Sequence, residues 1–572
     1  MLRVPAARTL SALAALVVIA LTAASADAQR GSAQSRPGTE RADLVVVNAR
    51  IYTVDNARPM ASALAVRNGR VIFVGSDSEA RLLAGRAARL VDLKGHTVIP
   101  GMVDAHAHLL GLATSMRNVL LAGSNSYDEV IRRVSERVRT VKPGEWVEGR
   151  GWDQNLWADK SFPTHEALSR ATPNNPVVLR RVDGHATLAN AMAMRLAGIT
   201  ASTKDPEGGK IVRLANGNPS GVFVDNAAGL VNTRIPSASD ATLREATLAA
   251  IAEANRWGLT GIHDAGASRR AIEIFESLAV EGKFNLRNYV MVSDIPGDIA
   301  YYTGRGPRSG LHGGRIWVRA IKTYADGALG SRGAALLAAY SDDSGNVGLL
   351  VKQPAHLQQV AELGLRSGFQ VNTHAIGDRG NRIALDAVAA ALKAVPTADH
   401  RFRIEHAQIV SAEDIPRFAQ LGIIPSMQAS HQTSDMGWAE ARVGPQRVRG
   451  AYAWRSLLNT GVVIPNGSDF PVEQVNPLIS FHSAVTRQDP GNLPAGGWYP
   501  DQVMTRDEAL RAMTIWPAYA AFQEKELGSL TPGKYADFVV LDRDIMQVPP
   551  TEILATRVLA TYLGGRIVHE LK

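Results

Sequence analysis

The chain has no cysteine among its 572 residues. Disulfide bonds, thiolate metal ligands and a cysteine nucleophile are therefore excluded, and an exported form of the protein would be held together by its core alone. Any bound metal ion must use histidine, carboxylate or modified lysine side chains.

A strong excess of one charge is also missing. The formal net charge is +8 at pH 7, and no block of Lys and Arg with interleaved aromatic residues occurs. We therefore expect no nucleic-acid partner. A hydrophobic content of 45% with 20% charged residues is typical of a soluble globular protein and argues against a mainly disordered or membrane-embedded chain.

Long apolar runs are absent except at the N-terminus. There a basic start precedes the run Leu10 to Ala24, and a small-x-small cleavage pattern follows at 26–28. This pattern predicts a signal peptide over 1–28, a flexible lead over 29–42, and a secreted or periplasmic protein without stable membrane association. The alternative is a membrane anchor, but the run is shorter than the roughly 18 to 20 residues needed to span a bilayer.

Both ends of the remaining chain have short β-rich runs separated by glycine-rich turns. We predict that 43–97 and 521–572 form one composite β-sandwich lobe, with the central domain inserted between its two parts. Two separate hairpins decorating the central domain are the alternative.

The central region alternates apolar strands with helical stretches, which is typical of a parallel α/β sheet. Its extent favours a (β/α)8 TIM-type barrel over 98–520, with an insertion at about 110–250 after the first barrel strand, where the alternation fails. The predicted strands are 316–324, 369–374, 402–406, 423–427 and 462–466. The predicted helices are 355–366, 379–395, 412–421 and 446–459.

One apolar run, Val98 to His108, ends in His-Ala-His. In an extended strand positions i and i+2 share a face, so His106 and His108 can bind one cation, and Asp104 lies on the same face. Two polar residues closing a buried strand would explain the pair as well.

Four further candidates come at or just after the ends of later strands: Lys322, His374, His406 and Asp469. Each alone is unremarkable. In a barrel, however, the carboxyl ends of the strands meet at one mouth, which would bring these side chains and the first histidine pair together. Such a nitrogen and oxygen donor set suits Zn²⁺ or Mn²⁺.

Several motifs resemble those of the amidohydrolase superfamily, and within it the family 3 branch that includes N-substituted formamide deformylase. The resemblance runs from about residue 43 to residue 568. It is strongest in Pro-Gly-Met-Val-Asp-Ala-His-Ala-His, Ile-Lys-Thr-Tyr-Ala-Asp-Gly-Ala-Leu-Gly-Ser-Arg-Gly, His-Ala-Ile-Gly-Asp-Arg, Ile-Glu-His-Ala-Gln and Gly-Ser-Asp-Phe-Pro-Val. It implies a metal-bearing barrel with a composite β-sandwich.

The resemblance also implies a role for each candidate. His106 and His108 would bind one metal ion, His374 and His406 the other, and Asp469 would lie beside the bound water. Lys322 would bridge two ions, which we expect to be Zn²⁺ with Mn²⁺ as the alternative. A free ammonium group repels cations, so the bridge requires a carbamate formed with CO₂. An unmodified lysine would favour one ion.

Contacts to the substrate are expected from loops near the strand ends and from the insertion. His185 is expected to polarise a substrate carbonyl, although stabilising its own loop is the alternative. Residues expected to line the pocket are Asp326, Arg332, Gln428 and His431, with Trp152, Trp157 and Trp438 as an aromatic wall or as ordinary packing. His263 also ends a strand but is left out of the metal set.

These assignments predict a hydrolase of non-peptide or small acyl amide carbon-nitrogen bonds. Metal-bound water would lose its proton to Asp469 and attack a small-molecule amide, and Asp469 would pass the proton to the leaving nitrogen. An N-acyl-amino-acid hydrolase or dipeptidase is the alternative, favoured by a cationic pocket to which Arg332 would contribute. A non-catalytic scaffold is a third hypothesis. A homodimer is expected from the family resemblance alone.

Overall fold

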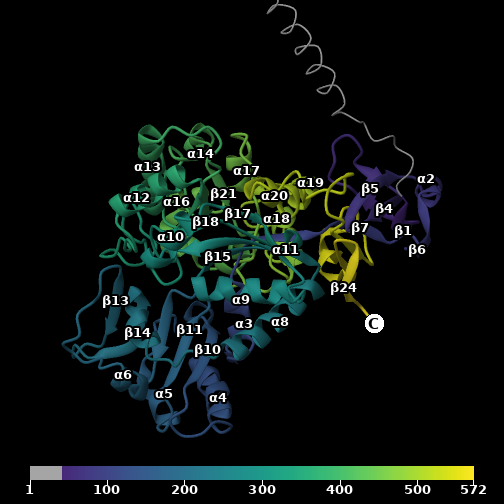
Figure 1. Cartoon of the computed structure of the whole chain (residues 1–572). Helices are drawn as coiled ribbons and strands as arrows, with labels where there is room; N and C mark the ends of the chain where they lie inside the picture. Colours follow the sequence, from purple (N-terminus) through teal and green to yellow (C-terminus); the bar gives the residue numbers. More distant parts are fainter. Residues whose placement is uncertain (1–40) are drawn as a thin grey trace, which may run out of the picture.

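The structure is a computed structural model that describes residues 41–572. The predicted signal peptide, and the predicted lead up to residue 40, lie outside the described residues. Figure 1 shows a central sheet with its helices, a second sheet to one side, and the two ends of the described chain together on the other side. Within 41–572 no helix is long and apolar enough to cross a membrane.

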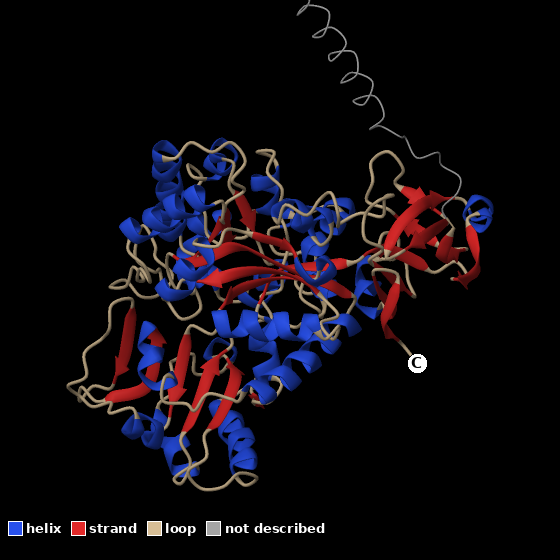
Figure 2. Ribbon diagram, viewed as in Figure 1, coloured by secondary structure: helices blue, strands red, loops and turns tan. Residues whose placement is uncertain are grey.

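Seven parallel strands form the central sheet, which is nearly closed (Figure 2). Their hydrogen-bonded order is β21-β20-β19-β18-β16-β15-β8, and β17 (Arg308–Gly310) pairs antiparallel with β18. The seven strands are β8 (Met102–Ala107), β15 (Leu259–Ala267), β16 (Arg287–Ser293), β18 (Ile316–Tyr324), β19 (Gln370–Ala375), β20 (Arg403–His406) and β21 (Ile424–Ser426). The predicted strands 316–324, 369–374, 402–406 and 423–427 are confirmed to within about two residues.

The two edges of this sheet meet at Asn466. Asn466 forms a parallel bridge with Met427, just beyond β21. Its carbonyl accepts a hydrogen bond of 3.1 Å from the amide of Ala105 in β8. The predicted strand 462–466 is therefore reduced to one bridging residue at this gap.

Helices cover the outside of the central sheet. They include α8 (Asp240–Arg256), α9 (Arg269–Val280), α10 (Pro296–Thr303), α11 (Leu311–Gly314), α12 (Pro354–Ser367), α13 (Asp378–Ala394), α14 (Ile415–Leu421), α15 (Ala429–Asp435), α18 (Pro477–Thr486), α19 (Arg506–Ala512) and α20 (Ile515–Ala520). The predicted helices 355–366, 379–395 and 412–421 correspond to α12, α13 and α14. Buried Leu, Ile, Val and Ala side chains from these helices and the strands form one large core.

The predicted continuous helix 446–459 is wrong. The chain instead forms α16 (Ala439–Arg447), a 3₁₀ turn (Val448–Gly450) and α17 (Trp454–Leu458). The carbonyl of Gly450 accepts from the amide of Val410, and the amide of Tyr452 donates to the carbonyl of Gln408. The backbone between the helices is used in pairing with this neighbouring segment, so it cannot continue a helical ladder.

Between β8 and β15 the chain builds a second sheet of six strands in the order β13-β14-β12-β11-β10-β9. Its strands are β9 (Val119–Leu120), β10 (Val147–Trp152), β11 (Val177–Arg181), β12 (Ala186–Ala189), β13 (Gly209–Arg213) and β14 (Pro219–Asp225). The helices of this region are α3 (Leu109–Ser115), α4 (Tyr127–Val138), α5 (His165–Ala171), α6 (Ala191–Leu196) and α7 (Gly229–Asn232). Two separate apolar clusters stabilise this sheet.

The two ends of the described chain share a third part. One sheet has the order β5-β4-β1-β6 and the other the order β24-β23-β22-β7-β2-β3, and a common apolar cluster contains residues of both. The strands are β1 (Ala42–Val47), β2 (Arg50–Tyr52), β3 (Met60–Ala61), β4 (Ala63–Arg67), β5 (Arg70–Gly75), β6 (Ala84–Asp92), β7 (Thr97–Pro100), β22 (Phe538–Leu541), β23 (Val558–Leu563) and β24 (Arg566–Glu570), with α2 (Asp77–Leu82) between β5 and β6. In the first of these sheets β1 pairs antiparallel with β4 and parallel with β6.

The apolar run 98–108 is divided at Gly101. The β7 strand before it pairs with β22, whereas β8 after it belongs to the central sheet. A Cβ atom at residue 101 would lie 2.2 Å from Oγ1 of Thr260, so only glycine fits at this crossing. A buried ion pair between Arg287 at the start of β16 and Asp537 before β22 also joins the two parts.

Candidate metal centre

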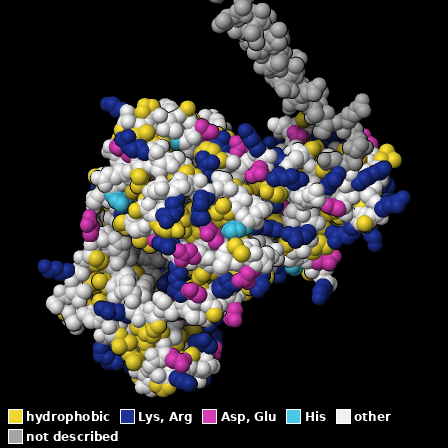
Figure 3. Space-filling model, viewed as in Figure 1, with side chains coloured by type: hydrophobic (Ala, Val, Ile, Leu, Met, Phe, Trp, Pro, Cys, Tyr) yellow, Lys and Arg dark blue, Asp and Glu magenta, His cyan; other side chains and the backbone are white. Residues whose placement is uncertain are grey.

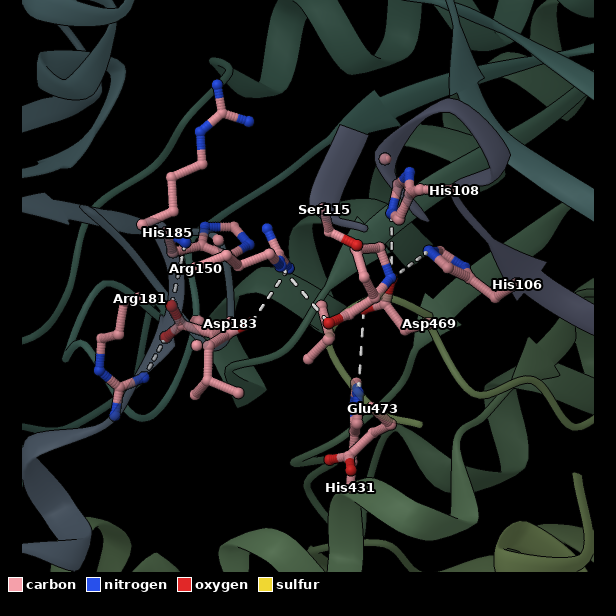
Figure 4. A pocket seen from close by; sticks show the side chains of 18 of the residues that line it. His106, His108, Ser115, Arg150, Arg181, Asp183, His185, His431, Asp469 and Glu473 are labelled. Carbon is pink, nitrogen blue, oxygen red and sulfur yellow. Dashed lines mark hydrogen bonds and ion pairs between the residues drawn. The ribbon is translucent and has the colours of Figure 1, made fainter. Parts of the chain in front are cut away.

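His106 and His108 lie at the carboxyl end of β8, and both imidazoles face Asp469. His106 is within β8, whereas His108 follows it at the N-cap position of α3 without a capping hydrogen bond from its side chain. Oδ1 of Asp469 is 3.0 Å from Nε2 of His108 and 3.6 Å from Nε2 of His106. Figure 4 shows the three side chains converging.

Three more strands of the central sheet add a side chain to this cluster. Lys322 comes from β18, His374 from β19 and His406 from the last position of β20. Nζ of Lys322 is 3.5 Å from Nε2 of His106. The His406 ring centroid lies 4.7 Å from that of His106 and 4.6 Å from that of His374. The structure therefore brings together all six side chains that the sequence proposed as metal ligands.

The donor atoms of this cluster fit a cation. Ligand atoms of His106, His406 and Asp469 all lie within 4.8 Å of one another. Nε2 of His374 is buried and has no hydrogen-bond partner in the described part of the chain, and Oδ1 of Asp469 is buried against the ring nitrogens of His106 and His108. An unpartnered buried polar atom is costly, and a bound metal ion would satisfy it.

The protonation states also suit metal binding. Burial lowers the pKa of His106 to about 4 and lowers the pKa values of His374 and His406 well below the usual value. At neutral pH these imidazoles are uncharged, which is the form that ligates metals. Burial raises the pKa of Asp469, but His106 and His108 outweigh this effect and hold it well below the usual value.

A second set of residues orients the histidines. Nδ1 of His106 contacts the carboxylate of Glu405, which forms a buried ion pair of 2.7 Å with Arg403. Burial opposes the charge on Glu405, yet Arg403 and His106 lower the pKa of this carboxyl group to about 2. Nδ1 of His406 lies 2.7 Å from Oε1 of Gln428. Partners of this kind fix the ring orientation and leave Nε2 for a metal.

Asp104 supports the loop that carries Asp469. Its carboxylate accepts hydrogen bonds from the backbone amides of His106 and Ser468, and from the Ser468 hydroxyl at 2.6 Å. Asp469 itself has φ 60°, a strained conformation for a residue other than glycine. Asp104 thus holds the loop in place instead of facing the same cation as the histidines.

A cavity of about 710 Å³ opens above the cluster, between the central sheet and the second, six-stranded sheet. Its wall includes the six candidate ligands together with His185, His431 and Trp438. His185 comes from the insertion; its Nδ1 lies 2.6 Å from Oδ1 of Asp225, and its ring centroid is 5.1 Å from that of His374. Burial lowers the pKa of His185, but Asp225 outweighs it, and the net effect is a raised pKa.

Five residues expected to contact the substrate do not line the cavity: Trp152, Trp157, Arg332, Asp326 and Gln428. Trp152 is fully buried in the insertion core, where Nε1 donates to the carbonyl of Leu179 at 2.8 Å, and Trp157 packs beside it. Arg332 forms an ion pair of 3.0 Å with Asp342. These placements correct the expectation of a wall containing Trp152, Trp157 and Arg332.

Asp326 and Gln428 are also buried behind the wall. Asp326 accepts hydrogen bonds from the backbone amides of Ala335, Ile376 and Gly377 and therefore stabilises the turn after β19. Gln428 contacts His406. His263, which was left out of the metal set, packs on Tyr289 and lies 2.9 Å from Nη1 of Arg403, away from the cavity.

Other cavity residues were not predicted from the sequence. They include Tyr324, two residues after Lys322, Arg150 of β10 and Arg180 of β11 in the second sheet, and Asp435 and Glu473. Arg150 and Arg180 lie in β10 and β11, and the register of these two strands decides whether their side chains face the cavity. Glu405 behind the wall could have been found, because it directly precedes His406 in a buried strand.

Comparisons with known proteins agree with this architecture. The model of the amidohydrolase family matches residues 89–569. N-substituted formamide deformylase of Arthrobacter pascens is 31% identical over 93% of this chain and 99% of its own length. Protein LONG AFTER FAR-RED 3 of Arabidopsis thaliana is 35% identical over 92% of each chain. The putative amidohydrolase YtcJ of Bacillus subtilis (strain 168) is 31% identical over 91% of this chain and 98% of its own.

Solved structures with similar folds include an uncharacterized metal-dependent hydrolase from Pyrococcus horikoshii OT3, with a TM-score of 0.72 and 27% identity over 89% of this chain and 99% of the other. Atrazine chlorohydrolase TrzN from Arthrobacter aurescens TC1 complexed with zinc has a TM-score of 0.52 and 15% identity, over 92% of this chain and 95% of the other, and shares the fold alone.

Proposed function

The chain belongs to the amidohydrolase family, and on that premise we propose that it hydrolyses an amide carbon-nitrogen bond of a small molecule in a metal-dependent reaction. The observation that carries the proposal is a cluster of four histidines, one aspartate and one lysine beneath a cavity, in which all side chains except the partly exposed His108 are buried. Non-peptide amides and small acyl amides, including N-substituted formamides, are the proposed substrates, and the name of the Arthrobacter relative supports them.

Two divalent ions, Zn²⁺ or alternatively Mn²⁺, would be held by His106, His108, Lys322, His374, His406 and Asp469. Bound ions supply a Lewis acid and a water molecule of lowered pKa. Lys322 would take part as a carbamate: its nitrogen forms a bond to the carbon of CO₂ and releases a proton. Burial lowers the pKa of Lys322 to about 8, so an appreciable fraction of the amine is uncharged and able to react.

Asp469 is the proposed proton carrier. Its low pKa keeps the carboxylate ionised and able to accept a proton, which it would then pass to the leaving nitrogen. Its Oδ1 lies 3.0 Å from Nε2 of His108, and the residue lines the cavity.

His185 is proposed to bind the substrate carbonyl oxygen. Because Nδ1 is engaged by Asp225, Nε2 is the nitrogen left to donate toward the cavity. The raised pKa of His185 favours the protonated form, in which that donation is strongest. His431, whose Nε2 is 3.8 Å from Oδ2 of Asp469, is proposed to complete the substrate pocket with Trp438.

The domain organisation, the cellular location and the oligomeric state are also proposals. We interpret the two terminal sheets as a composite β-sandwich and residues from about 110 to 250 as an insertion into a (β/α)8 barrel. Export to a secreted or periplasmic location, and a homodimer, stay predictions. On the face drawn in Figure 3, Lys and Arg side chains occur together with Asp and Glu, and the absence of a nucleic-acid partner stays a prediction.

Substitution of Asp469 by Asn tests the proposed reaction. The purified chain, loaded with Zn²⁺ and screened against N-substituted formamides and other small amides, should turn over at least one of them. The variant D469N should lose about 10²- to 10⁴-fold in kcat, the usual contribution of a proton-transfer group, and keep its metal. D507N, at a side chain 65% exposed on α19, is the control. Full activity of D469N would remove Asp469 from the reaction.

A further inference from the structure

Two arginines of the insertion lie side by side on the cavity wall. Arg150 in β10 and Arg180 in β11 are register partners in a parallel strand pair. Register partners point to the same face of a sheet, and both residues line the cavity. Two like charges in this arrangement repel each other unless an anion lies between or above them.

Neither guanidinium group has a carboxylate partner. Arg150 donates from Nη2 to the carbonyl of Val182 at 3.0 Å and from Nε to that of Pro471 at 3.4 Å. Nε of Arg180 is buried without any partner in the described part of the chain. Over residues 41–572, no carboxylate oxygen comes within 4.0 Å of either group. The neighbouring Arg181 differs, because it pairs with both Asp153 and Asp183.

The charge environment of Arg150 agrees with this lack of a partner. Burial lowers its pKa from the usual value, and the charge of Arg180 lowers it further, while Asp469 and Asp183 oppose the change. An anion bound at these two groups would compensate both the burial and the repulsion.

We infer that Arg150 and Arg180 bind a carboxylate group of the substrate. The inference rests on the proposed amide hydrolysis and narrows its substrate to amides that carry a carboxylate, such as N-acyl amino acids. Guanidinium groups match carboxylates in geometry as well as in charge. The sequence suggested that Arg332 contributes to a cationic pocket for such a substrate, and we now assign this contribution to Arg150 and Arg180.

Arg150 also contacts the loop that carries Asp469. Its Nε contacts the carbonyl of Pro471, two residues beyond Asp469. Figure 4 shows Arg150 between the Asp183 and His185 segment of the insertion and the Asp469 loop. The proposed carboxylate site is therefore next to the loop that carries Asp469.

The acidic groups opposite do not cancel this preference. Burial raises the pKa of Asp435 to about 7 and also raises that of Glu473. Both groups already accept hydrogen bonds, Asp435 from Tyr452 and Glu473 from Ser434. Asp435 is therefore partly protonated near neutral pH and repels an anion less than an ionised carboxylate would. The pKa of Glu473 is shifted in the same direction.

The test compares an N-acyl amino acid with its neutral methyl ester as substrates of the Zn²⁺-loaded chain. The acid should have the higher kcat/KM. R150Q and R180Q should each lower kcat/KM for the acid about 10- to 100-fold and leave the ester nearly unchanged. Gln at residue 150 keeps a neutral donor at the chain position of Nε, which is the atom that contacts the carbonyl of Pro471. R195Q, at an exposed position on α6, is the matched control.

Equilibrium binding separates this inference from the proposed function. Calorimetry of Zn²⁺-loaded D469N with the same two compounds measures recognition of the carboxylate without turnover. Tighter binding of the acid, lost in the double variant D469N/R150Q, supports the arginine site even if neither amide is hydrolysed. Equal binding of acid and ester, or an equal loss for both compounds in R150Q, would overturn it.

Discussion

The replacement of Glu405 by Gln tests whether the buried network behind His106 holds the metal centre. Glu405 contacts Nδ1 of His106 and pairs with Arg403 at 2.7 Å, and both members of that pair are fully buried. Loss of a partner behind a ligating histidine typically weakens metal binding about 10- to 100-fold, or about 1.4 to 2.7 kcal/mol. We expect E405Q to lose Zn²⁺ at correspondingly lower chelator concentrations.

The same change should reduce stability in a defined pH range. The pKa of Glu405 falls from 4.5 to about 2 on folding, which corresponds to about 3 kcal/mol of stability above pH 4.5. This contribution is present above the unfolded pKa and is lost as the pH falls toward 2. Thermal unfolding of the metal-free protein should therefore show a smaller acid dependence in E405Q than in the wild type.

Asp537 provides the matched control, because it also forms a buried ion pair but contacts Arg287 far from the candidate ligands. D537N should destabilise the fold and leave the affinity for Zn²⁺ unchanged. If E405Q bound Zn²⁺ as tightly as the wild type, or if D537N lost metal to the same extent, the argument that Glu405 positions His106 would be refuted.

Three further changes have expected outcomes. K322M removes a buried amine, so the metal-free protein should gain about 1 to 4 kcal/mol in stability. The metal content of the Zn²⁺-loaded protein should fall. An unchanged metal content would contradict the bridging role of Lys322. H185N should keep its metal and lose about 10²- to 10³-fold in kcat, and unaltered kinetics would limit His185 to stabilising its loop. W152F removes the hydrogen bond to Leu179, so thermal unfolding should show a loss of about 1 to 3 kcal/mol with unchanged kcat/KM; altered kinetics would return Trp152 to the substrate site.

The candidate ligands could be predicted because each is a local feature of the sequence. His106, Lys322, His374 and His406 lie at or near the ends of apolar strands, and the parallel barrel places such ends together. The strand positions and the fold class are therefore sufficient to predict that these side chains meet. The positions of the loops above the strands are not required.

For residues outside the central strands, the sequence does not show whether a side chain faces the cavity. The direction of the side chain depends on contacts with segments that are distant in the sequence. Arg332 lies only ten residues beyond Lys322, yet it turns toward Asp342. Trp152 ends a strand next to a cavity residue, but its side chain faces the insertion core. The spacing of residues in a loop or an irregular sheet does not reveal which side chains reach a shared cavity.

Contacts between distant segments also explain two features that the sequence did not predict, the arginine pair in the cavity and the break between α16 and α17. Arg150 and Arg180 are 30 positions apart in the chain and become neighbours only through the register of β10 and β11. The break between α16 and α17 likewise comes from pairing with Gln408 and Val410 rather than from a strong local signal. Local patterns predicted the elements and the ligands, whereas long-range pairing decided the shape of the pocket.

The metal content of the purified chain tests the central claim most directly. Native mass spectrometry of the Zn²⁺-loaded protein, combined with elemental analysis, counts ions per chain and detects the added mass of about 44 Da expected for a lysine carbamate. The account predicts two ions and one carbamate, both reduced in K322M. A chain that hydrolyses amides with no bound metal, or that keeps its full metal content in K322M, would contradict it.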